Sequence, residues 1–148
     1  MTVNSNNLFY LCSLVEFIGR TQGLERKAVV NLLGADNLNR IYEQADVLHC
    51  EPIEKIADEY IHYFDIQKGS FDNVGSCRYT VPDHFTIGKV YQRLIEDTLT
   101  DDNLIPHIME VYNSWVSETE SAIIIQISTI SPELISLFVI RKKIDSVV

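Results

Sequence analysis

The sequence predicts a mainly α-helical protein, with a four-helix N-terminal half and a helical C-terminal extension that includes a short β-prone segment. Apolar residues recur at three- and four-residue spacing through most of the chain, which is the pattern of amphipathic helices. Glycine, proline and capping residues divide this pattern into typical helix lengths. Residues 122–130 are rich enough in β-branched side chains to favour a strand, and residues 78–81 could form a short one that Pro82 ends.

The clearest predicted helix covers residues 52–64. Pro52 suits the first helical position, because it has no backbone N–H to satisfy and its φ is already helical. Behind it, apolar side chains follow one face for three turns and should pack against a core. Glu51 and Lys55 have the four-residue spacing of a surface ion pair. The apolar stripe comprises Ile53, Ile56, Ala57, Tyr60, Ile61 and Phe64.

Three further helices are expected before this one, each bounded by residues that favour helix ends. The first is capped by Ser5 or Asn6 and ends near Gly23. The second ends at Gly34, and the third begins at Asp36. Four helices with short connections imply a compact bundle. The three expected ranges are residues 8–20, 24–33 and 36–45.

Residues 65–83 lose the helical pattern and contain several glycine, serine and proline residues. A loop of this length is uncommon inside a small domain and often marks a functional segment or a boundary. We interpret it as a hinge between two units, residues 1–66 and 67–148, which alternatively form one compact domain.

The C-terminal extension should begin with a helix capped by Asp83, followed by one capped at Thr100, Asp101 or Asp102. Residues 122–140 are apolar-leaning and precede three basic residues, as in a membrane tail. Proline, glutamate, glutamine and several hydroxyl residues interrupt this segment. We therefore expect a core element or an oligomer interface there, and no membrane span.

Composition excludes several classes of protein. A formal charge of −9 argues against binding to nucleic acid or to an anionic membrane, since both require lysine and arginine. Three widely spaced cysteines do not form a disulfide framework, and no signal peptide is visible, so we expect a cytoplasmic protein. The four histidines are scattered and no glycine-rich phosphate loop is present, which predicts no metal site and no cofactor.

Two groups of residues suggest a function. Arg78 and His84 lie just ahead of a predicted helix and resemble the arginine–histidine signature of helical ribonuclease toxins, in which the imidazole acts as acid or base. The second group is an acidic stretch without lysine or arginine, which would attract a basic protein partner. Its carboxylates are Glu96, Asp97, Asp101, Asp102, Glu110, Glu118 and Glu120.

Residues 8–64 also resemble a small bacterial helical family of unknown function. The resemblance implies a gene beside toxins with ADP-ribosyltransferase-like folds, in suspected toxin–antitoxin loci, and it carries no active-site residues. It rests on Phe9-Tyr10-Leu11-Cys12 with Glu16, on Val29-Val30 and Leu32-Leu33, and on Ile41-Tyr42 before Asp46-Val47-Leu48-His49.

The leading hypothesis is thus a non-enzymatic interaction protein, antitoxin-like or accessory to a toxin–antitoxin or mobile-element locus, with no catalytic residues. One alternative is a toxin-like ribonuclease that uses Arg78 and His84. Another is a homo-oligomeric structural module assembled through residues 122–140.

Overall fold

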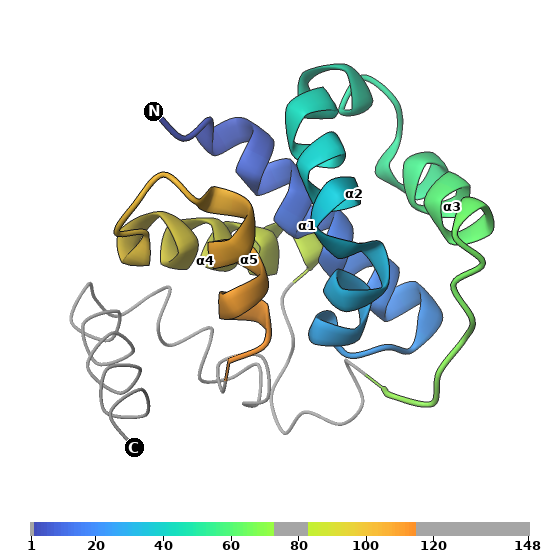
Figure 1. Cartoon of the computed structure of the whole chain (residues 1–148). Coiled ribbons are helices and arrows are strands. Elements are labelled where there is room, and N and C mark those ends of the chain that lie inside the picture. Colours follow the sequence, from blue (N-terminus) through green and yellow to red (C-terminus); the bar gives the residue numbers. More distant parts are fainter. Residues whose placement is uncertain (1, 73–82, 115–148) are drawn as a thin grey trace.

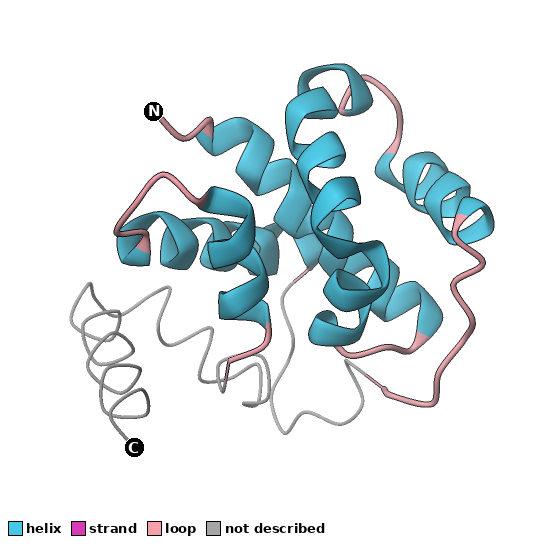
Figure 2. Ribbon diagram, in the orientation of Figure 1, coloured by secondary structure: helices cyan, strands magenta, loops and turns pink. Residues whose placement is uncertain are grey.

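The computed structural model describes residues 2–72 and 83–114, and these ranges contain five helices and no strand (Figures 1 and 2). The prediction of a mainly α protein is confirmed. The short strand at 78–81, the β-prone segment at 122–130 and the predicted interface at 122–140 lie outside the described residues. The helices are α1 (Ser5–Gln22), α2 (Arg26–Leu48), α3 (Ile53–Tyr63), α4 (His84–Thr98) and α5 (Leu104–Tyr112).

Helix α1 is the centre of the fold, because α2, α3 and α4 all pack against it (Figure 1). Its side chains Leu8, Leu11, Leu14, Val15 and Ile18 are completely buried. Helix α5 covers α2 and contacts α4. Every helix contributes to one hydrophobic core, so residues on both sides of the predicted hinge share the same interior.

The ends of α1 are defined by one asparagine and one glycine. The Asn4 side chain accepts a hydrogen bond from the backbone N–H of Asn7 at 3.1 Å. The predicted cap at Ser5 or Asn6 is therefore wrong by one or two residues, because the extended backbone of Asn4 aims its amide at the first turn. The predicted end near Gly23 is confirmed, since Gly23 adopts the left-handed conformation that terminates helices.

The predicted break at Gly34 is confirmed as a kink that divides α2 into two helical segments. Gly34 has φ 77° and ψ 168°, whereas the chain is helical on both sides of it. The Asn37 side chain donates to the carbonyl oxygen of Leu33 at 2.7 Å and so satisfies an acceptor at the kink. The two segments of α2 correspond to the second and third predicted helices, although the helix resumes directly after Gly34, ahead of the predicted start at Asp36.

Helix α3 closely follows its prediction. Pro52 precedes the first helical residue with an extended ψ of 138°, and Glu51 pairs with Lys55 at 3.2 Å. The apolar stripe faces the core: Ile53, Ile56 and Ala57 are buried. The remaining members of the stripe, Tyr60, Ile61 and Phe64, are partly buried against the core.

The segment after α3 returns to the turn between α1 and α2. The backbone N–H of Gly69 donates to the Gln22 carbonyl at 2.7 Å, and that of Phe71 donates to Gly23 at 2.9 Å. A Cβ on Gly69 would lie 2.6 Å from the Gly23 oxygen, so only glycine permits this approach. The start of the predicted hinge is therefore held against the bundle.

Helix α4 packs closely along α1. A Cβ on Gly88 would lie 2.3 Å from Ser13 Oγ, so the missing side chain allows the two backbones to approach. The predicted cap at Asp83 is confirmed, because its carboxylate accepts the Thr86 N–H at 2.8 Å. The predicted cap of the last helix is wrong: α5 begins after Asn103, whose backbone N–H binds the Asp101 side chain at 2.8 Å.

Candidate functional site

The predicted acidic stretch lies mainly at the C-terminal end of α4 and in the connection to α5. Asp97, Asp101 and Asp102 are exposed there, and we call these three residues the acidic turn. Glu110 is also exposed but lies further along, in α5. The structure thus brings three of the predicted carboxylates to one end of the bundle. Glu118 and Glu120 lie outside the described residues.

Glu96 has a structural role that distinguishes it from its neighbours. It is half-buried, and it accepts hydrogen bonds from Ser5 Oγ at 2.5 Å and from Gln92 Nε2 at 2.9 Å. The bond from Ser5 joins the end of α4 to the start of α1, and the bond from Gln92 lies within α4. The adjacent acidic turn is consequently presented on a fixed helix end.

Of the two residues of the ribonuclease alternative, the structure describes only His84. Arg78 is outside the described residues. His84 begins α4, and its ring packs on Phe17 and Phe85 with centroid distances of 5.0 and 4.3 Å. Burial lowers the pKa of His84, although the neighbouring Asp83 opposes this effect. The ring is therefore a half-buried member of an aromatic cluster.

A buried ionic cluster, which the sequence analysis did not identify, links α1 to α2. Glu16 is only 2% exposed, and its carboxylate pairs with Arg20 at 2.9 Å and with both Nε and Nη2 of Arg26. The Arg26 guanidinium lies 5.6 Å from the ring centre of Tyr91. An acid inside an otherwise apolar helix face, four residues before an arginine, was the available signal.

The buried thiol of this region is unreactive. Cys12 is 1% exposed in the core, and burial raises its pKa to about 12. A thiol in that state carries almost no thiolate at neutral pH. Cys12 is thus a core residue and not a nucleophile.

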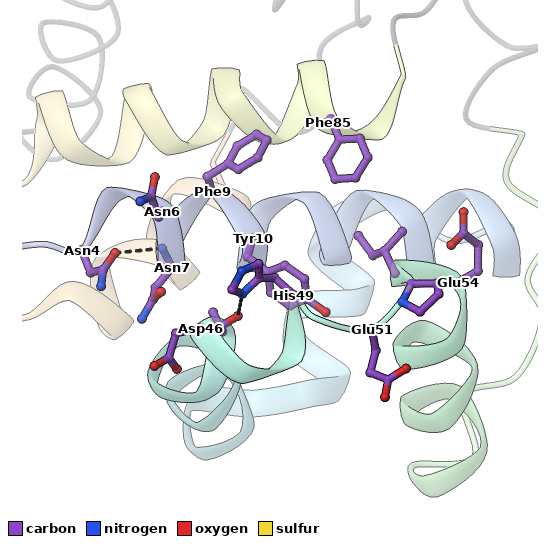
Figure 3. Close-up of a pocket in the computed structure, with 13 residues that line it drawn as sticks. Asn4, Asn6, Asn7, Phe9, Tyr10, Asp46, His49, Glu51, Glu54 and Phe85 are labelled. Carbon is purple, nitrogen blue, oxygen red and sulfur yellow. Dashed lines mark hydrogen bonds between the residues drawn. The ribbon is translucent and has the colours of Figure 1, made fainter.

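A surface groove of about 720 Å³ lies over the N-terminal half of α1, and we call it the α1 groove (Figure 3). Helix α4 contributes Phe85 to one side, and the α2–α3 connection contributes the other. Asp46 and His49, which belong to the stretch that carries the family resemblance, both line it. The complete lining is Asn4, Asn6, Asn7, Phe9, Tyr10, Ala45, Asp46, His49, Glu51, Pro52, Ile53, Glu54 and Phe85.

Sequence reasoning missed the α1 groove because its walls come from distant parts of the chain. Residues 4–10, 45–54 and 85 meet only through helix packing. The one sequence signal was an aromatic residue, Phe85, at the start of the predicted helix and next to its polar cap.

Within residues 2–72 and 83–114, no cluster of three or more histidine, cysteine, aspartate or glutamate side chains could hold a metal ion. None of the helices in those ranges combines the length and the hydropathy that crossing a membrane requires. Comparisons of the chain with protein-family models, with curated proteins and with solved structures found no match.

Proposed function

We propose that this protein is a non-enzymatic interaction module that covers a basic surface of a protein partner. The observation that carries the proposal is the acidic turn, Asp97, Asp101 and Asp102, exposed at the end of α4. The resemblance of residues 8–64 to a family encoded beside toxins supplies the biological setting. In that setting the protein is an antitoxin-like or accessory component of a bacterial toxin–antitoxin or mobile-element locus.

Electrostatics favour such a partner. Residues 94–114 contain no lysine or arginine, and the whole chain carries a formal charge of −9. A concentrated negative potential speeds the encounter with a basic surface and disfavours acidic competitors. Glu96 accepts hydrogen bonds from Ser5 and Gln92, and these bonds fix the end of α4. The acidic turn therefore loses little conformational entropy when a partner binds.

The test is recovery of a partner with the full-length protein and two matched variants. Asp97→Asn/Asp102→Asn removes two charges from the acidic turn, and Glu25→Gln/Asp36→Asn removes two exposed charges, one just before α2 and one within it. Tagged protein is expressed in the native host, and co-purifying proteins are identified by mass spectrometry. We expect a stoichiometric partner that binds the first variant roughly tenfold more weakly and the second unchanged, because only the first loses interfacial charge.

Two results would contradict the proposal. One is the absence of any stoichiometric protein partner. The other is a partner that binds both variants equally well, which would place its contact away from the acidic turn.

A further inference from the structure

We propose that the α1 groove is a second binding site, which takes a cationic amphipathic peptide segment by an apolar anchor. The groove shares no residue with the acidic turn. The inference therefore stands independently of the proposed function.

The walls of the groove suit an apolar anchor. Phe9 and Phe85 stack with ring centroids 6.0 Å apart, and Phe85 remains 44% exposed. Ile53 continues the apolar lining from α3. A volume of about 720 Å³ accommodates several side chains, and aromatic walls of this kind typically hold the anchor residues of a ligand.

The charged residues at the rim of the groove determine which charge a ligand must carry. Asp46, Glu51 and Glu54 are exposed, and none of the lining residues is lysine or arginine. Lys55 pairs with Glu51, whereas Asp46 and Glu54 have no ion-pair partner among the residues that the structure describes. Lys89 Nζ lies 5.6 Å from the ring centre of Phe9, so the α4 side of the groove carries a positive charge and the cations of the ligand are directed to Asp46 and Glu54 on the other side.

The floor of the groove includes a buried tyrosine. Tyr10 lines the groove and is 7% exposed, and its Oη has no hydrogen-bond partner among the described residues. That oxygen is itself shielded from solvent, so Tyr10 offers its ring to a ligand and not its hydroxyl. Beside it in Figure 3, His49 is held by an interaction between its Nδ1 and the Ala45 carbonyl oxygen at 3.0 Å.

The ligand is a peptide segment, since the site combines apolar walls with separated rim charges. Helices dock into such grooves by anchors on one face, with their charged side chains at the edge. A rim with two unpaired carboxylates selects lysine or arginine at those edge positions.

Three fluorescent peptides of about four helical turns test this chemistry with the full-length protein. The first peptide has leucine on one face and lysine on the other. In the second peptide glutamate replaces the lysine, and in the third serine replaces the leucine. We expect saturable binding of the leucine–lysine peptide alone in fluorescence anisotropy, weakened roughly tenfold when NaCl rises from about 50 to about 500 mM. Equal binding of the serine–lysine peptide would overturn the apolar anchor, and equal binding of the leucine–glutamate peptide would overturn the charge selection.

Variants then locate the site. Asp46→Asn/Glu54→Gln and, separately, Phe85→Ala should each weaken binding of the leucine–lysine peptide by about tenfold. Glu25→Gln/Asp36→Asn is the matched control and should bind as the wild type does. Thermal unfolding followed by circular dichroism confirms that each variant is folded.

The outcomes separate the two sites. Loss of peptide binding in Asp97→Asn/Asp102→Asn, with normal binding in the groove variants, would overturn the inference and leave the proposed function intact. Loss confined to the groove variants would support the inference, whichever result the partner recovery gives.

Discussion

At the scale of single residues, we expect the buried ionic cluster to contribute most to the stability of the fold. Glu16 sits between Arg20 and Arg26, and Arg26 is 7% exposed. Removing charges from water is costly, so a buried pair is stable only while each charge keeps its partner. Glu16 therefore ties the beginning of α2 to the middle of α1.

Substitution Glu16→Gln should destabilise the protein strongly, because Arg26 would then be buried without a compensating charge. We expect a loss of about 3–5 kcal/mol in the free energy of unfolding, measured by urea denaturation. The control is Glu51→Gln at the exposed pair with Lys55, which should cost about 0–1 kcal/mol. Equal small losses in both variants would show that the buried cluster contributes little.

At the scale of elements, α4 shows how cap and packing act together. Asp83 caps its first turn, and Gly88 allows close contact with Ser13 on α1. The backbone N–H of Thr86 is the main cause that lowers the pKa of Asp83 below its ordinary value, with smaller help from His84 and Phe85. The folded state thus favours the carboxylate form of Asp83.

This shift makes the contribution of the cap dependent on pH. Because the folded pKa is the lower one, the stabilisation is complete above the unfolded pKa of about 3.9 and disappears as pH falls through the folded pKa. Asp83→Ala should cost about 1 kcal/mol near pH 7. That difference from the wild type should vanish near pH 2, as measured by chemical denaturation.

Asp83→Asn is the matched variant for this prediction, because its amide oxygen can accept the same Thr86 N–H without titrating. Its stability relative to Asp83→Ala should not change with pH. A cost of Asp83→Ala that is the same at both pH values would contradict the assigned role of the carboxylate.

At the scale of the whole molecule, the helices differ in how firmly they are held. Helices α1, α2 and α4 share most of the core, whereas α3 buries only Ile53, Ile56 and Ala57 completely and packs chiefly against α1. One side of the α1 groove is formed by the residues that lead into α3. The α1 groove thus lies next to α3, which is held by few buried residues.

Native-state hydrogen exchange should therefore reveal two levels of stability. Backbone amides of α3 should exchange through a partial opening at least about 1 kcal/mol below global unfolding, while the amides of central α1 exchange only on global unfolding. Mass spectrometry or NMR of the full chain measures both. Identical opening free energies for α3 and α1 would show that the bundle unfolds as one unit.

Much of the fold could be predicted from the sequence because helix signals are local. The stripe from Ile53 to Phe64, the stop at Gly23 and the cap at Asp83 each depend on a few neighbouring residues. The break at Gly34 was likewise predicted, from the preference of glycine for helix ends, whereas the cap at Asn4 was missed because it was decided by the backbone conformation of one residue and by a side-chain bond.

The candidate sites differ in the same way. Three carboxylates of the acidic turn lie within six residues of one another, so the sequence by itself predicted that they would be close. The Glu16–Arg26 contact and the α1 groove were decided only by the tertiary structure. Periodicity tells which face of a helix is buried, but not which other helix covers it. The angles at which α3 and α4 cross α1 depend on packing against the whole core. That packing places Phe85 opposite His49 across the groove (Figure 3).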